Sequence, residues 1–285
     1  MRTGYRIVKK EVYSPVTYMW EVEAPDVARA AQPGHFVIVR MSEEGERIPL
    51  TVADFDRQRG TVTVVIQAVG KSTREMMQLN QGDSILDFIG PLGEASHIEK
   101  RSKVILVGGG LGVAPVYPQL RAYKELGSTT LSIIGFRTKG LVFWEERFRA
   151  YSDELHIATD DGSYGHKGFV SQVLQILLEE HRDPEEVVAI GPLPMMKACC
   201  DVTRPFGVRT MVSLNSVMVD GTGMCGSCRV TVGGKLKFAC VDGPDFDGHQ
   251  VDFDELMRRQ RRFQREEQES LKRYEEECRL RGRTP

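Results

Sequence analysis

The sequence predicts a mixed fold: an antiparallel β-barrel, then a doubly wound parallel sheet, then a small cysteine-bearing lobe that ends in a helix. Short apolar segments broken by Gly, Pro and Asp fill residues 1–100, and strand and helix patterns alternate over residues 101–210. Residues 211–250 are rich in glycine and cysteine, and the tail at 251–285 mixes Arg and Glu densely. A chain of 285 residues is long enough for several compact units of this kind.

The barrel is predicted from strand-like segments that follow one another without a helical pattern between them. Residues 4–13, 17–24, 35–42 and 60–69 alternate or run apolar, and turn-forming residues separate them. Consecutive short strands at this spacing are typical of a small antiparallel barrel.

The parallel sheet is predicted from the change of pattern at residue 103. Strand patterns lead the segments 103–115, 129–137, 155–161 and 186–202, and helical patterns cover 116–127, 143–152 and 169–181. Regular alternation of strand and helix predicts βαβ units and hence a doubly wound sheet. The tail is expected to be helical, with a thin apolar stripe made of Phe253, Leu256, Phe263, Leu271, Tyr274 and Cys278.

Composition and charge exclude several classes of partner. Apolar residues make up 41% of the chain, charged residues 27%, and the net charge is −2, so nothing indicates binding to nucleic acid. No apolar run is long enough to span a membrane, and the N-terminal residues lack the apolar core of a signal peptide. We therefore expect a cytoplasmic protein without a membrane partner.

A glycine-rich turn between a strand and a helix predicts a nucleotide site. Residues 107–115 contain Gly108, Gly109, Gly110 and Gly112, and glycines at such a turn let backbone amides approach a pyrophosphate beside a helix N-terminus. Val113 replaces the third glycine of the usual dinucleotide fingerprint. After the third strand, Asp160 or Asp161 is placed to bond a ribose hydroxyl, and a carboxylate there would repel the extra phosphate of NADP and so favours NAD.

Three cysteines near the end of the chain predict a metal centre. Cys225 and Cys228 have Cys-x2-Cys spacing and Cys240 follows, so a fourth ligand is needed, for which Asp220 and His249 are candidates. From this spacing alone, structural zinc, an iron–sulfur cluster and reduced cysteines without a metal all remain open. Cys199 and Cys200 lie on a helical pattern and are expected to be buried packing residues.

Together, these segments resemble the ferredoxin–NADP reductase superfamily, and the resemblance covers nearly the whole chain. Within it they are similar to the electron-transfer subunit of dihydroorotate dehydrogenase B. They are more similar still to the small subunit of NADH-dependent ferredoxin:NADP oxidoreductases, also called sulfide dehydrogenases. The resemblance implies an FAD-binding barrel at 1–100, an NAD-binding domain at 101–210 and a lobe at 211–250 that binds a 2Fe–2S cluster. In these relatives four ligands are spaced Cys-x4-Cys-x2-Cys with one more after a hairpin, which implies Asp220, Cys225, Cys228 and Cys240 as the ligands here.

The resemblance also implies the remaining cofactor contacts. Residues 47–51 match the Arg-x-Tyr-Ser/Thr flavin motif, with Ile48 at the arginine position and Leu50 where the tyrosine would stack on the flavin ring. The residues implied for FAD are Arg47, Pro49, Leu50, Thr51, Ile66, Ala68, Gly70, Ser72 and Thr73. Those implied for NAD(H) are Gly108, Gly109, Gly110, Gly112, Ala114, Pro115, Asp160, Asp161, Gly191 and Pro192.

The function implied by the resemblance is electron transfer. NADH passes a hydride to FAD, and the 2Fe–2S cluster relays single electrons to a larger flavin and iron–sulfur subunit that is linked to NADP and ferredoxin, within an electron-bifurcating enzyme. Hydride transfer needs no side-chain acid or base, so no catalytic residue is assigned. The alternatives are an electron-transfer subunit of dihydroorotate dehydrogenase B or of a hydrogenase and, from another class, a zinc-stabilised nucleotide-binding module.

Overall fold

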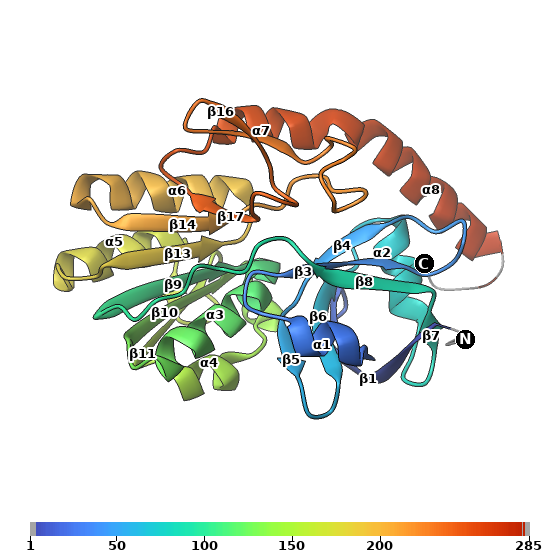
Figure 1. Ribbon diagram of the computed structural model, residues 1–285, viewed down its shortest axis with the longest axis horizontal. Coiled ribbons are helices and arrows are strands. Elements are labelled where there is room, and N and C mark those ends of the chain that lie inside the picture. Colours follow the sequence, from blue (N-terminus) through green and yellow to red (C-terminus); the bar gives the residue numbers. More distant parts are fainter. Residues whose placement is uncertain (1–3, 281, 283–285) are drawn as a thin grey trace.

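The computed structural model describes residues 4–280 and 282, and it shows the mixed α/β architecture that the sequence predicts (Figure 1). Two groups of residues lie outside the described part of the chain: 1–3, in the predicted barrel, and 281 and 283–285, in the predicted tail. Within the described part of the chain, no helix combines the length and the apolar character needed to cross a bilayer.

The N-terminal third forms two antiparallel sheets around one core. One sheet has the strand order β5–β6–β2–β1–β7 and contains β1 (Tyr5–Ser14), β2 (Thr17–Glu23), β5 (Asp54–Asp56), β6 (Thr61–Gln67) and β7 (Ser84–Ile85). The other has the order β4–β3–β8 and contains β3 (Phe36–Arg40), β4 (Ile48–Thr51) and β8 (Asp87–Leu92). The helices α1 (Pro25–Ala30) and α2 (Lys71–Gln78) lie between strands in the sequence. Trp20, Val64 and Ile7 from the first sheet and Val37 and Leu50 from the second share one buried cluster.

The middle of the chain forms a seven-stranded sheet of order β12–β11–β10–β9–β13–β14–β17 (Figure 1). Its strands are β9 (Lys103–Gly109), β10 (Thr129–Phe136), β11 (Glu154–Thr159), β12 (His166–Lys167), β13 (Glu186–Ile190), β14 (Arg209–Ser213) and β17 (Asp245–Asp247). All neighbouring pairs are parallel except β14 with β17. Because the chain moves outward from β9 to β12 and then returns to place β13 on the other side of β9, the strand order reverses between β9 and β13.

Helices cover both faces of this sheet because its central strands are apolar on both sides. In β9, Ile105 and Val107 belong to the core under α5 and α6, whereas Val104 and Leu106 belong to the core under α3 and α4. The four helices are α3 (Val113–Glu125), α4 (Glu145–Tyr151), α5 (Val170–Glu180) and α6 (Leu193–Thr203). Short 3₁₀ turns occupy Gly110–Gly112, Lys139–Leu141 and Arg204–Phe206. The cysteines Cys199 and Cys200 are buried on α6.

The cysteine-bearing segment is a loop followed by the hairpin β15 (Arg229–Val232) and β16 (Lys235–Phe238). The chain then returns to the large sheet through β17. The large sheet therefore includes β14, which crosses the predicted boundary at 210, and β17, which lies inside the predicted lobe at 211–250. The tail is helical, as α7 (Phe253–Gln260), a 3₁₀ turn at Arg261–Phe263 and α8 (Gln264–Leu280). Of its predicted apolar stripe, Phe253, Leu256 and Cys278 are buried, whereas Phe263 is 46% exposed.

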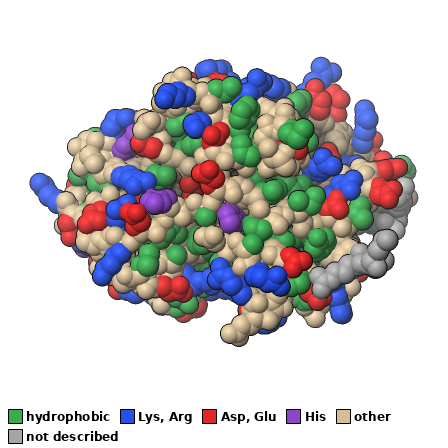
Figure 2. All heavy atoms as spheres, viewed as in Figure 1, with side chains coloured by type: hydrophobic (Ala, Val, Ile, Leu, Met, Phe, Trp, Pro, Cys, Tyr) green, Lys and Arg blue, Asp and Glu red, His purple; other side chains and the backbone are tan. Residues whose placement is uncertain are grey.

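The C-terminal helix α8 runs from the cysteine-bearing lobe to the N-terminal sheets and lies beside α2 (Figure 1). Arg74 on α2 and Glu275 on α8 form an ion pair of 2.9 Å, and both side chains are about one third exposed or less. The tail is therefore attached at both ends. Figure 2 shows Lys, Arg, Asp and Glu side chains intermingled over one face of the molecule, in keeping with the small net charge.

Candidate functional site: a thiol loop packed against the N-terminal sheets

The three cysteines and Asp220 lie in one loop and its hairpin, and the backbone directs amides at the sulfurs. The thiols of Cys228 and Cys240 are buried and their sulfur atoms are 3.2 Å apart, whereas Cys225 is exposed. Burial and the neighbouring Cys228 thiol raise the pKa of Cys240 to about 12, and the Gly223 amide bonds to its sulfur. Hydrogen bonds from Ser227 lower the pKa of Cys225. Amides that point at sulfur atoms stabilise thiolate ligands and help set the potential of a bound iron–sulfur cluster.

The Asp220 carboxylate is held inside this loop by the backbone. Its Oδ1 accepts from the Thr222 amide at 2.6 Å, and its Oδ2 accepts from the Cys225 amide at 2.7 Å. These hydrogen bonds lower the pKa of Asp220, so the group is ionised at neutral pH. An ionised carboxylate retains further lone pairs for a metal after it has accepted one hydrogen bond at each oxygen.

The four groups are arranged in two pairs. Cys228 lies against Cys240, and Asp220 lies beside Cys225. Among the residues that the structure describes, no three His, Cys, Asp or Glu side chains converge as a single metal ion requires. A 2Fe–2S cluster takes two protein ligands at each iron, and hard oxygen ligands are compatible with ferric iron, so two ligand pairs fit such a cluster. His249, the other candidate for the fourth ligand, instead bonds through Nε2 to the hydroxyl of Thr203 at 2.9 Å.

The thiol loop packs directly against the second N-terminal sheet. Gly221 has φ +73°, and a Cβ there would lie 2.7 Å from Leu92 Cδ1 and 3.4 Å from Ile38 Cγ1, so only glycine allows this approach. Ile38 on β3 is the antiparallel partner of Pro49 on β4. Directly opposed residues have their side chains on the same face, with Cα atoms about 5 Å apart. The predicted flavin segment and the predicted cluster loop therefore meet on one face of this sheet.

The predicted flavin residues divide between the two faces of β4. Leu50 points into the core and is only 7% exposed, whereas Pro49 and Thr51 are partly exposed on the side of Ile38. Arg47 precedes the strand and is exposed. Because successive residues of a strand point to opposite faces, little of the Leu50 side chain is accessible to a ligand, whereas Pro49 and Thr51 lie on the accessible face.

At the start of α2, side chains that were predicted to approach a pyrophosphate are bonded within the protein. The hydroxyl of Thr73 accepts from the amides of Val69 and Gly70 at 3.1 Å each, and Ser72 Oγ donates to Glu46 Oε2. Ile66 and Ala68, earlier in the same segment, are buried. No hydrogen bond in the described structure uses the amides of Lys71 and Ser72, and no atom lies within 4 Å of a Cβ built on Gly70. The helix N-terminus is therefore left with backbone donors and open space, which suit an anion.

The predicted nicotinamide residues gather at the carboxyl edge of the large sheet, where the strand order reverses. A Cβ on Gly191 would lie 3.0 Å from the Gly109 carbonyl oxygen, so the turns after β9 and β13 are in contact. Gly112 allows α3 to pack on the Ile190 carbonyl, and Gly108 allows it to pack on β9. Gly110 has φ +55° and nothing within 4 Å of its Cβ position. Gly108 and Gly112 therefore serve packing, and Gly110 borders open space.

The other predicted nicotinamide residues lie around this edge. Ala114 is buried in the first turn of α3, Pro115 is partly buried beside it, and Pro192 is exposed at the start of α6. After β11, Asp160 is exposed, and Asp161 accepts from the amide and hydroxyl of Ser163 at 2.9 and 2.6 Å. These bonds lower the pKa of Asp161 and keep it ionised.

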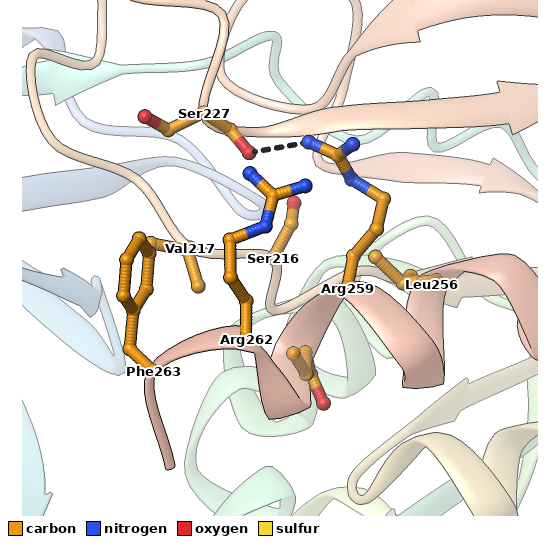
Figure 3. A pocket seen from close by; sticks show the side chains of 8 residues that line it. Ser216, Val217, Ser227, Leu256, Arg259, Arg262 and Phe263 are labelled. Carbon is orange, nitrogen blue, oxygen red and sulfur yellow. Dashed lines mark hydrogen bonds between the residues drawn. The ribbon is translucent and has the colours of Figure 1, made fainter. Parts of the chain in front are cut away.

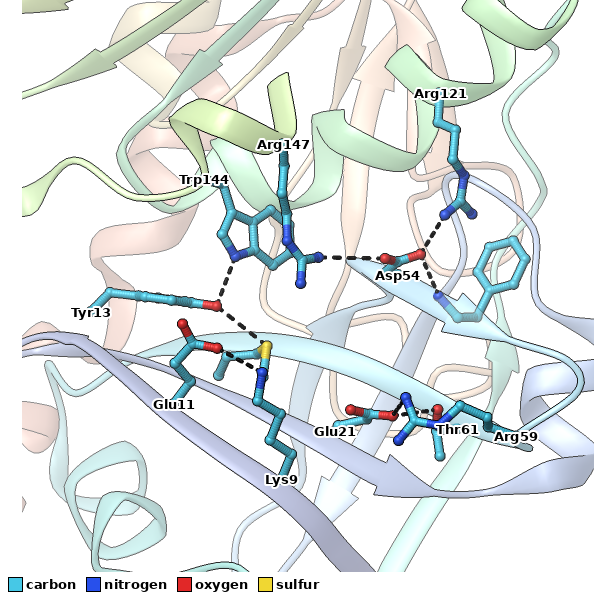
Figure 4. Close-up of polar contacts among 12 residues, drawn as sticks. Lys9, Glu11, Tyr13, Glu21, Asp54, Arg59, Thr61, Arg121, Trp144 and Arg147 are labelled. Carbon is cyan, nitrogen blue, oxygen red and sulfur yellow. Dashed lines mark hydrogen bonds and ion pairs between the residues drawn. The ribbon is translucent and has the colours of Figure 1, made fainter. Parts of the chain in front are cut away.

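Polar contacts join the N-terminal sheets to the helices that cover the seven-stranded sheet (Figure 4). Asp54 accepts from Arg121 at 2.7 Å and lies 3.5 Å from Arg147, and Trp144 Nε1 donates to the Tyr13 hydroxyl at 2.7 Å. On another side, Asp245 on β17 accepts from Ser96 and Gln119, and burial raises the pKa of its carboxyl. These contacts hold α3 and α4 against β1 and β5, and they hold β17 against the segment that follows β8.

The sequence interpretation missed an arginine that contacts the thiol loop. Arg259 on α7 donates to the Ser227 carbonyl at 3.3 Å (Figure 3). The run of four arginines within residues 258–262 was a possible signal, although periodicity places it on a charged helix and does not show what that helix meets.

Comparisons with known proteins find relatives over nearly the whole chain. Residues 215–252 match the family model described as the iron–sulfur cluster binding domain of dihydroorotate dehydrogenase B. The chain is 47% identical to a dihydroorotate dehydrogenase B (NAD(+)) electron transfer subunit homolog of Thermotoga maritima, over 94% of each chain. It is 34% identical to the corresponding electron transfer subunit of Bacillus caldolyticus, over 88% of this chain and 98% of the other. A solved structure of an NADH-dependent reduced ferredoxin–NADP oxidoreductase, described in connection with flavin-based electron bifurcation, superposes with a TM-score of 0.91. It has 44% identity, over 96% of this chain and 98% of the other.

Proposed function

The chain belongs to the family of dihydroorotate dehydrogenase B electron-transfer subunits and their homologues, and on that premise we propose that it carries electrons between NAD(H), FAD and a 2Fe–2S cluster. It is an NAD(P)H-linked oxidoreductase subunit. Bound FAD supplies the change from hydride transfer to single-electron transfer, and the cluster supplies a one-electron carrier.

One observation carries the proposal. Gly221, next to the proposed ligand Asp220, packs on Ile38, and Ile38 is the strand partner of the proposed flavin residue Pro49. The backbone of Gly221 thereby packs on the side chain of a residue that lies 183 positions earlier in the chain. A short separation between flavin and cluster is what single-electron transfer between them requires.

The chain's own residues bind and orient the two cofactors. The free amides of α2 and the open space at Gly70 suit the FAD pyrophosphate, and Pro49 and Thr51 would border the flavin. Asp220 and Cys225 would hold one iron, and Cys228 and Cys240 the other. The two ligand pairs favour this cluster over zinc, which requires four ligands around one ion.

The nicotinamide dinucleotide would lie across the reversal point of the large sheet, beside Gly110 and Gly191. The carboxylate of Asp161 is ionised, and a negative charge at that edge opposes the extra phosphate of NADP. This supports NAD(H) over NADP(H) as the dinucleotide of this chain.

We further propose that the chain works as the small subunit of an electron-bifurcating NADH- and ferredoxin-linked NADP oxidoreductase, with a larger flavin and iron–sulfur subunit as its partner. The 44% identity and TM-score of 0.91 to such an enzyme support this assignment. Around the thiol loop, Met224 is 89% exposed, Val219 43% and Val241 40%, so apolar side chains surround the exposed Cys225. Exposed apolar groups at the proposed electron exit suit a subunit contact.

Anaerobic reduction of the purified chain by NADH tests the function. We expect the flavin absorbance to bleach and an electron paramagnetic resonance signal of a reduced 2Fe–2S cluster to appear in the same sample. A colourless chain that contains stoichiometric zinc would instead establish the zinc-stabilised nucleotide-binding module. Co-purification with a dihydroorotate dehydrogenase or a hydrogenase would replace the proposed partner.

Substitution of Asp220 by cysteine tests the fourth ligand. We expect Asp220→Cys to keep the cluster and lower its midpoint potential, by on the order of 60 mV, because thiolate donates more charge to iron than carboxylate does. A redox titration followed by electron paramagnetic resonance measures the shift. Asp254→Cys, the same replacement on the exposed side of α7, serves as the control, and an equal potential in both variants would show that Asp220 is not a ligand.

A further inference from the structure

A small cavity lies between the thiol loop and the junction of α7 with the following 3₁₀ turn (Figure 3). Its volume is about 50 Å³, and its polar lining comes from Ser216, Ser227, Arg259, Gln260 and Arg262. One water needs about 10–15 Å³, so the cavity has room for a group of several oxygen atoms. Ser227 lies in the thiol loop between the proposed ligands Cys225 and Cys228, and the other polar residues belong to none of the proposed cofactor sites.

The charged side chains that line this cavity, Arg259 and Arg262, are both positive. In the part of the chain that the structure describes, neither Arg259 nor Arg262 has a carboxylate within 4.0 Å. Burial lowers the pKa of Arg259, and the nearby charges of Arg262 and Arg229 lower it further, although Glu255 one turn earlier and Cys228 offset part of this effect. Arg259 is partly buried, whereas Arg262 and Arg229 are exposed. An anion beside Arg259 and Arg262 would reduce the repulsion between their like charges.

A buried hydroxyl faces the same cavity without a partner. Ser216 is 5% exposed, and its Oγ has no hydrogen-bond partner among the described residues. A buried polar group without a partner costs about 1–3 kcal/mol. The Arg259 guanidinium is already oriented by its bond to the Ser227 carbonyl, which leaves its other N–H groups as donors.

We propose that this cavity is an anion-binding site for a single phosphate or carboxylate group, held by the guanidinium groups of Arg259 and Arg262 and by the hydroxyl of Ser216. Guanidinium groups recognise both anions by paired hydrogen bonds. The anion is either a free phosphate ion or the carboxylate of an acidic side chain on a partner subunit. The site goes beyond the proposed electron transfer and does not depend on it, because none of its groups is a proposed cofactor ligand.

Titration calorimetry on the full-length chain as purified, at constant ionic strength and pH 7, tests the site with inorganic phosphate and with acetate. We expect saturable binding, weakened about tenfold by Arg262→Gln, the effect of removing one charged donor. Arg258→Gln is the matched control, since Arg258 is exposed on α7, close to Arg262 in the sequence, and does not line the cavity. Ser216→Ala should weaken binding less than Arg262→Gln and raise the melting temperature of the anion-free chain, because it removes the unpaired hydroxyl.

The two probes separate the sources of the anion. Binding of phosphate but not acetate identifies a free phosphate ion, and binding of acetate identifies a carboxylate ligand such as an acidic side chain. The absence of saturable binding of either probe to the wild-type chain, or equal losses in Arg262→Gln and Arg258→Gln, would overturn the proposal. Iron content is measured on the same samples, so a chain that binds anions without iron would uphold this site and refute the cluster.

Discussion

Replacement of Cys240 by alanine is expected to reduce the iron content of the chain to background while the flavin remains bound. Cys240 would supply half of one ligand pair, and its sulfur lies 3.2 Å from that of Cys228. An iron left with one protein thiolate loses a ligand that no neighbouring side chain replaces, because no other cysteine belongs to this loop. Iron analysis and electron paramagnetic resonance of the reduced protein measure the loss.

The matched control is Cys200→Ala. Cys200 and Cys240 are both 1% exposed, so both substitutions delete a sulfur atom from a buried position and create similar cavities. Only Cys240 lies in the thiol loop, so Cys200→Ala should retain iron even if its melting temperature falls. Full iron content in Cys240→Ala would contradict the ligand assignment. Flavin reduction by NADH should persist in Cys240→Ala, because the nicotinamide edge does not include this residue.

Replacement of Gly110 by valine is expected to slow flavin reduction by NADH about a hundredfold, which corresponds to about 2.7 kcal/mol. Gly110 has φ +55° and borders the open space at the reversal point of the sheet, where a dinucleotide would approach the backbone. A branched side chain disfavours this backbone conformation and fills the space that the phosphates need. Stopped-flow absorbance of the flavin after mixing with NADH measures the rate.

Gly127→Val separates backbone strain from loss of the site. Gly127 has φ +80° and only Lys100 Nζ, at 4.0 Å, near its Cβ position, so valine is strained there as well. It lies between α3 and β10, at the opposite edge of the sheet from Gly110. We expect Gly127→Val to lose stability but keep its rate with NADH. Equal rates in both variants, with dithionite reduction unchanged, would show that NADH does not bind at Gly110.

Much of the fold could be read from local patterns. Periodicity within short windows predicts the strand that precedes the glycine turn, the alternation of strand and helix after it, and the helical tail. The positions of the cysteines and of Asp220 within one loop follow from their spacing. Such features depend on neighbours in the sequence, and those are visible without a structure.

Other features depend on contacts between distant segments. The sequence interpretation placed Leu50 at the flavin, but its phase on β4 turns it into the core and turns Pro49 outward. Ser72 was expected to face a phosphate, but its hydroxyl bonds to Glu46, 26 residues earlier. The side of a strand that faces the core, and the hydrogen-bond partner of a side chain, depend on which distant segments pack together. The pattern of a single segment therefore does not predict them.

By itself, the sequence determined which candidate groups this protein has and their order along the chain: a strand segment that resembles a flavin motif, a glycine turn, and a loop with one carboxylate and three thiols. Only the tertiary structure decided that Gly221 rests on Ile38, that Gly109 meets Gly191 and that Arg259 reaches Ser227. The physical reason is that local residue patterns govern backbone conformation, whereas long-range packing of apolar faces governs which surfaces meet.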